Sequence, residues 1–64
     1  MRASIMGQTI EGTPNAIAEV MRALSMAARR FEELDCTWQA SEYRKDADKM
    51  FDDLERIGFY DEEV

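Results

Sequence analysis

Apolar residues follow two helical registers along the chain. The first set steps by three and four residues through Ile17, Val20, Leu24, Ala27, Phe31 and Leu34. The second set steps in the same way through Ala40, Tyr43, Ala47, Met50, Leu54 and Ile57. This spacing stacks side chains on one face of an α-helix. Each set therefore predicts an amphipathic helix with one buried face.

The two registers do not join into one. The first reaches Trp38 and then meets three polar residues, Ser41, Lys45 and Asp48. A break between residues 35 and 41 predicts an antiparallel pair of helices, about 14–35 and about 38–57, rather than a single rod. Trp38 either extends the first buried face, caps the helical pair, or stands off the second helix as an interface anchor. Asp35 or Thr37 is the expected N-cap of the second helix, with Ser41 as an alternative.

Local signals mark the outer ends of the two helices. Thr13 is a favourable N-cap, and Pro14 suits the first helical position, where its missing N–H is no loss. Gly58 fits the left-handed position that follows a helix. We expect Phe59 to fold back on Leu54, which is the contact that accompanies such an ending.

Residues 2–10 alternate imperfectly and predict one short strand. Arg2, Ser4 and Gln8 would share one face, with Ala3, Ile5 and Thr9 on the other. A single strand must pair to satisfy its backbone groups. With no second strand apparent, the expected mate is the same strand of another copy or a partner protein.

The predicted fold class is mainly α, in one small domain over residues 1–64. An extended arm or strand at 1–12 precedes a helical hairpin at 13–58 and an acidic tail at 59–64. A chain of this size hides only about 60% of its unfolded surface. We therefore expect oligomerisation, most simply a dimer, to complete the core. Cys36 is the only cysteine, and with no apolar signal or membrane segment apparent, we expect a cytoplasmic protein.

The net charge of −6 is unevenly distributed. Residues 1–32 carry four arginines against three glutamates, whereas residues 33–64 carry eleven acids against four bases. An acidic surface repels phosphate backbones and membrane surfaces and attracts basic protein grooves. The expected partner is a protein with a basic surface, bound through Asp48, Asp52, Glu55, Asp61, Glu62 and Glu63. The alternative is that the acidity only keeps a small protein soluble.

Single apolar residues outside the two registers are candidate interface positions. Met26 projects opposite Ile17 and is surrounded by three arginines, Arg22, Arg29 and Arg30. Arginine is enriched at protein interfaces, which favours a contact point at Met26; the alternative is an ordinary exposed apolar residue. The full set of interface candidates is Ile5, Met26, Trp38, Phe59 and Tyr60.

No catalytic, metal or cofactor site is expected. The chain has no histidine, which removes the commonest general base and metal ligand. Cys36 lies among acids, which disfavour a reactive thiolate. An EF-hand loop beginning at Asp46 fails, because Phe51 stands where glycine is required. Instead, the acids of the second helix are expected to form ion pairs four residues apart, at Arg44–Asp48, Lys49–Asp53 and Asp52–Arg56.

A strand followed by two helices resembles the ribbon-helix-helix repressors, in which paired strands enter the DNA major groove. The resemblance covers topology only and implies that Arg2, Ser4 and Gln8 read DNA. The long first helix, the absence of glycine between the helices and the acidic surface favour a different function. We expect a non-enzymatic, self-associating interaction module that binds or inhibits a basic, nucleic-acid-handling protein. In size and charge it is similar to phage-borne inhibitors and DNA mimics. A structural or assembly subunit is a further alternative.

Overall fold

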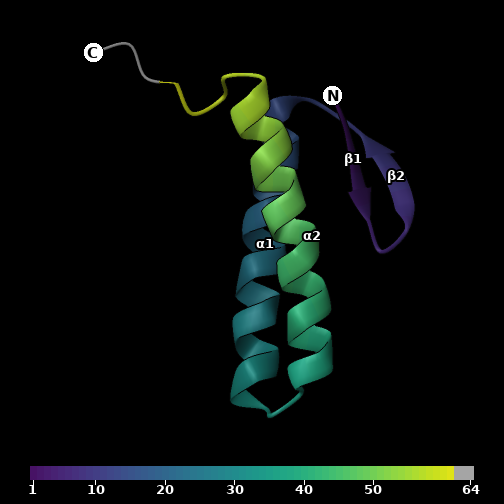
Figure 1. Ribbon diagram of the computed structural model, residues 1–64, viewed down its shortest axis with the longest axis vertical. Helices are drawn as coiled ribbons and strands as arrows, with labels where there is room; N and C mark the ends of the chain where they lie inside the picture. The colour runs from purple at the N-terminus through teal and green to yellow at the C-terminus, as the bar shows by residue number, and fades with distance from the viewer. Residues whose placement is uncertain (62–64) are drawn as a thin grey trace.

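The structure is a computed structural model that describes residues 1–61. Its elements in chain order are β1 (Arg2–Ile5), β2 (Gln8–Glu11), α1 (Pro14–Glu33) and α2 (Thr37–Arg56). The two helices run antiparallel, side by side, and the two strands form a small sheet beside α2 (Figure 1). This arrangement confirms the predicted mainly α class and the predicted helical hairpin.

The start of α1 and the end of α2 use the residues that the sequence marks. Thr13 Oγ1 accepts a hydrogen bond from the Ala16 N–H at 3.1 Å, and Pro14 is the first helical residue. Gly58 has a φ of +81°, and the Phe59 N–H donates to the Leu54 carbonyl at 3.0 Å. These two features define a Schellman ending. Phe59 packs against the core cluster, of which Leu54 is a member.

The connection between the helices corrects the predicted N-cap of α2. Asp35 has a φ of +62° and belongs to the end of α1, where the Cys36 N–H donates to the Phe31 carbonyl at 2.8 Å. The N-cap of α2 is Cys36, which makes no side-chain capping hydrogen bond. Thr37 is already the first residue of α2. The chain therefore stops α1 with a left-handed residue instead of starting α2 with a polar cap.

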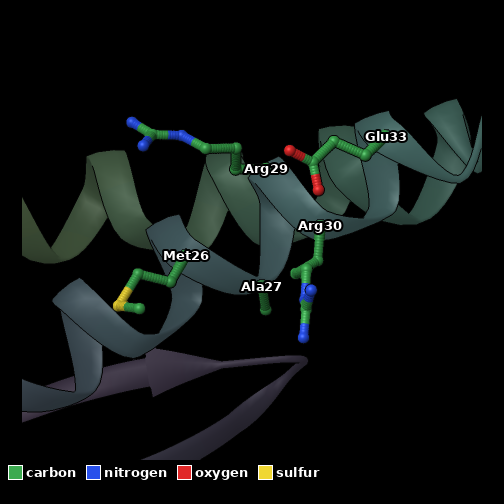
Figure 2. Close-up of a pocket in the computed structure, with 5 residues that line it drawn as sticks. All are labelled: Met26, Ala27, Arg29, Arg30 and Glu33. Carbon is green, nitrogen blue, oxygen red and sulfur yellow. The ribbon is translucent and has the colours of Figure 1, made fainter.

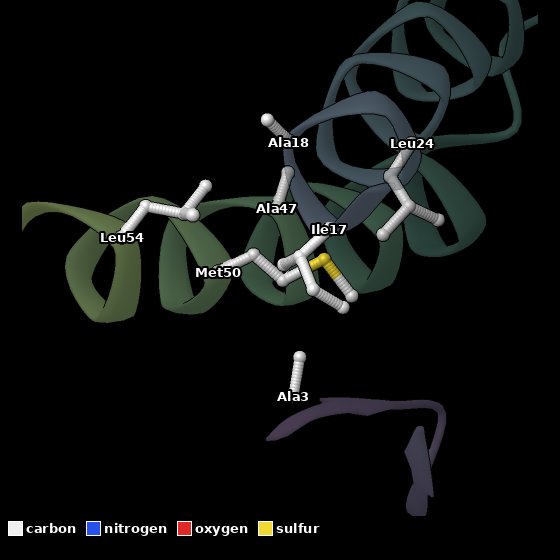
Figure 3. Close-up of a cluster of buried hydrophobic side chains, with 7 residues drawn as sticks. All are labelled: Ala3, Ile17, Ala18, Leu24, Ala47, Met50 and Leu54. Carbon is white, nitrogen blue, oxygen red and sulfur yellow. The ribbon is translucent and has the colours of Figure 1, made fainter. Parts of the chain in front are cut away.

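Residues of both helical registers form the core. Ile17, Met50 and Leu54 are its largest fully buried side chains. Figure 3 shows Ile17 and Met50 together between the helices, with Ala3 pointing toward them from the sheet. Two predicted members are wrong: Leu34 is 68% exposed and Ile57 is 55% exposed. Each lies just beyond the last residue of its helix, where the periodic face has ended.

The N-terminal segment is a β-hairpin and not the predicted single strand. β1 pairs antiparallel with β2, with Ala3 opposite Ile10 and Ile5 opposite Gln8. The turn consists of Met6 and Gly7, both with positive φ, at 49° and 81°. A two-residue type I′ turn requires this conformation. The strand therefore finds its mate within the same chain, and the expected pairing with a second copy is wrong.

The hairpin is fixed to the helices through one buried face and its turn. Ala3 is 4% exposed within the core, and Ile5 and Ile10 pack against its margin. At the turn, the Met6 N–H donates to Asp46 Oδ2 at 3.0 Å. This bond places the exposed side chain of Met6 beside the first half of α2.

Candidate protein-interaction surfaces

The acids on the outer side of α2 are not neutralised by the ion pairs that the sequence predicts. The helices instead carry four other pairs, with N···O distances of 2.6–3.9 Å: Arg22–Glu19, Arg44–Glu32, Lys45–Glu42 and Arg56–Asp53. Arg44 pairs across to α1, so it does not hold Asp48. Within residues 1–61, Asp48, Asp52 and Glu55 form no ion pair.

These three acids share one narrow sector of α2. Their spacing of four and then three residues confines them to about 60° of the helix circumference, at 100° per residue. All three are exposed. We call Asp48, Asp52 and Glu55 the acidic face. Its charge is open to a partner along two turns of helix.

An aromatic pair lies beside the acidic face. Phe51 is 42% exposed, and its ring centroid lies 5.0 Å from that of Tyr60. The Tyr60 hydroxyl in turn lies 3.7 Å from the sulfur of Met21 on α1. Phe51 is not among the interface positions predicted from the sequence, although it directly precedes Asp52 and lies near the edge of the apolar register. Of the predicted tail residues, Asp61 is exposed after α2, and Glu62 and Glu63 lie outside the described residues.

Met26 and Trp38 are the most exposed large apolar side chains among the described residues, each at 71%. Met26 is nine positions after buried Ile17, and Trp38 is nine positions before buried Ala47. Nine residues are two and a half helical turns, so each points directly away from the core. Trp38 is therefore neither a core residue nor a cap of the helical pair.

A hollow of ≈ 400 Å³ lies on the outer side of α1. We call it the α1 hollow; its lining residues are Met26, Ala27, Arg29, Arg30 and Glu33. Figure 2 shows Met26, Ala27 and Arg30 leaving α1 on one side, with the small Ala27 between the two longer side chains. Arg29 and Glu33 extend toward the other side in this view, and they also line the hollow. The first side is thus a shallow notch with a thioether at one end and a guanidinium at the other.

A second hollow of ≈ 380 Å³ adjoins Trp38. We call it the Trp38 groove; it is lined by Met6, Gly7, Trp38, Gln39, Glu42, Tyr43 and Asp46. Its only charged lining residues are Glu42 and Asp46. The sequence does not predict that Met6 and Gly7 line this groove, because only the hairpin turn brings them to α2. The Tyr43 ring is held in place by stacking on Phe31, at 5.3 Å between centroids.

Of the three remaining interface candidates, two are less available to a partner. Ile5 and Phe59 are half-buried and pack against this chain's own core. Tyr60 is 38% exposed and joins the aromatic pair beside the acidic face.

The proposed DNA-reading face of residues 2–9 does not assemble as the resemblance implies. Arg2 Nε lies 3.3 Å from a Glu11 carboxylate oxygen, so the basic residue is paired with an acid across the sheet. Gln8 stands opposite Ile5 and therefore lies on the other face from Arg2 and Ser4. The hairpin presents no cluster of unpaired basic side chains.

Residues 1–61 contain no group of three His, Cys, Asp or Glu side chains placed to hold a metal ion. No helix in the described part of the chain is long and apolar enough to cross a membrane. Cys36 is half-buried, with its sulfur 3.8 Å from the Leu34 carbonyl oxygen. Comparisons with protein-family models, with curated proteins and with solved structures find no match to this chain.

Proposed function

We propose that this protein is a small, non-enzymatic interaction module that self-associates and binds a protein partner through the acidic face. The observation that carries the proposal is the acidic face itself, with three exposed carboxylates that form no ion pair among the described residues and an aromatic pair alongside. Aromatic side chains are enriched at interface centres, and the charges around them steer encounter and select the partner. A basic, nucleic-acid-handling protein is the partner chemistry that this charge favours.

The binding would act by occupying a groove on the partner that otherwise receives phosphates. Charge complementarity raises the rate of encounter and rejects other acidic surfaces. Phe51 and Tyr60 would supply the apolar contact that makes the complex persist. A cytoplasmic location is part of the proposal and rests on the single cysteine, Cys36, which suits a reducing compartment.

The test compares two variants of equal net charge. The first neutralises the acidic face, by Asp48→Asn, Asp52→Asn and Glu55→Gln. The matched control neutralises three acids elsewhere, by Glu11→Gln, Glu19→Gln and Asp35→Asn. Each variant is used as bait in the native host lysate, and the captured partner is then purified and titrated against it.

We expect the acidic-face variant to lose partner binding at moderate salt, whereas the control binds as the unsubstituted chain does. The salt dependence of binding should also flatten, because fewer charges are involved. Equal binding by both variants would contradict the proposal. Duplex DNA serves as the second ligand: salt-sensitive binding that Arg2→Ala abolishes would favour the repressor-like alternative.

A further inference from the structure

The two most exposed apolar side chains lie on surfaces that match each other in chemistry. Trp38 projects from α2 with the carboxylate of Glu42 one helical turn farther along the chain. Met26 projects from α1 with the guanidinium of Arg30 one turn farther along. The ring of Trp38 and the carboxylate of Glu42 are thus four residues apart, as are the thioether of Met26 and the guanidinium of Arg30.

We propose that the α1 hollow of one copy receives Trp38 of a second copy. The indole lies on Ala27, between the side chains of Met26 and Arg30. This inference rests on the proposed self-association and names the surfaces that carry it. The hollow is shallow, so the ring would lie flat along α1 instead of entering an enclosed cavity.

Each contact in this arrangement has a physical basis. Methionine sulfur is attracted to aromatic rings. A guanidinium lies favourably on the face of an indole, for which tryptophan is the best partner among the aromatic residues. Arg30 forms no ion pair among the described residues, so it is available to both Trp38 and Glu42 of the second copy. Glu42 holds only Lys45, at 3.5 Å between exposed atoms, and that pair is easily exchanged.

The geometry requires association head to tail. Met26 and Trp38 each point away from the core, on the far sides of two helices that pack against one another. A copy that inserts Trp38 into its neighbour therefore keeps its own α1 hollow open for a third copy. Such a heterologous contact does not close with two copies and instead builds larger species.

The test uses two variants that each disable one side of the contact. Trp38→Ala removes the inserted ring. Met26→Ala combined with Arg30→Glu removes the thioether and opposes Glu42 with a like charge. Arg56→Glu at the end of α2 is the matched charge control for Arg30, and Ile57→Ala is the control for loss of an exposed apolar side chain. Circular dichroism confirms that every variant is folded.

Mass is measured by sedimentation from micromolar to millimolar concentration. We expect the unsubstituted chain and both controls to exceed twice the 7.4 kDa chain mass as concentration rises. Each disabled variant alone should stay at 7.4 kDa. An equimolar mixture of the two should form a dimer and stop there, because one copy supplies only the ring and the other only the hollow.

Tryptophan fluorescence gives a second readout, because Trp38 is the only tryptophan. Its emission should move to shorter wavelength as the unsubstituted chain associates, and it should do so in the mixture but not in the hollow variant alone. An unsubstituted chain that stays at 7.4 kDa would overturn both this inference and the proposed self-association. Association that both disabled variants retain, or a mixture that stays monomeric, would overturn the assigned surfaces alone. Partner binding through the acidic face is independent of all these outcomes.

Discussion

Replacing Leu24 with alanine tests the buried face of α1. Leu24 is 6% exposed and belongs to the core cluster. The change removes three carbon groups, which is about 2.4 kcal/mol at about 0.8 kcal/mol for each buried group. The cavity left behind raises the cost, whereas the better helix propensity of alanine returns a few tenths. We expect a loss of about 2.5–4 kcal/mol in the free energy of unfolding.

The matched control is Leu34→Ala, which removes the same atoms from the same apolar register. Leu34 is 68% exposed, so its replacement should cost less than about 0.5 kcal/mol. Arg22→Ala on the outer side of α1 should have an equally small effect. Urea unfolding followed at 222 nm measures all three, at a concentration low enough to avoid self-association.

A chain of this length has a total stability of roughly 3–10 kcal/mol, so Leu24→Ala leaves a small margin. Leu24→Val, with an expected cost of about 1 kcal/mol, keeps the comparison measurable if the alanine variant unfolds. Similar losses at Leu24 and Leu34 would refute the assigned burial, because the two substitutions differ only in their surroundings.

Three further substitutions test the backbone features, and all use the same urea measurement. Thr13→Ala should cost about 1 kcal/mol, because the Ala16 N–H loses its acceptor; an unchanged midpoint would mean that water replaces the cap fully. Asp35→Gly should stabilise by about 0.5–1 kcal/mol by relieving the left-handed backbone; a loss would show that the Asp35 side chain contributes. Gly7→Ala should cost about 1 kcal/mol although nothing lies within 4 Å of the added carbon, and a neutral result would argue against the type I′ turn.

The helical pair was predictable from the sequence because periodicity reports burial directly. Ile17 and Leu24 on α1, and Met50 and Leu54 on α2, were all placed in the core by spacing alone. The start at Pro14 followed from a cap whose chemistry is local. The predicted burial of Leu34 was wrong, because an apolar residue at the right spacing extends the sequence pattern even after the helix has ended.

The β-hairpin and the connection between the helices were not predictable in the same way, because both depend on residues in unfavoured backbone conformations. Met6 and Asp35 adopt positive φ, which the sequence signals clearly only when the residue is glycine or asparagine. Gly7 lies inside the segment that the alternation predicts as one strand, whereas in the structure it is the second residue of a turn between two strands. With the turn in place, Ala3 and Ile10 fall opposite each other, and the imperfect alternation of the single strand disappears.

The two kinds of candidate surface differ in how far the sequence predicts them. The position of the acidic face depends on residue spacing within α2, whereas the Trp38 groove depends on how the hairpin packs on α2. The shared sector of Asp48, Asp52 and Glu55 was foreseen from their spacing, although Asp48 and Asp52 were expected in ion pairs with Arg44 and Arg56 that do not form. The Trp38 groove was not foreseen, since the hydrogen bond from Met6 to Asp46 brings together residues forty positions apart. That bond also means that the groove depends on the hairpin turn. A variant that loosens the turn, such as Gly7→Ala, should therefore change the surroundings of Trp38 at denaturant concentrations where the two helices are still folded.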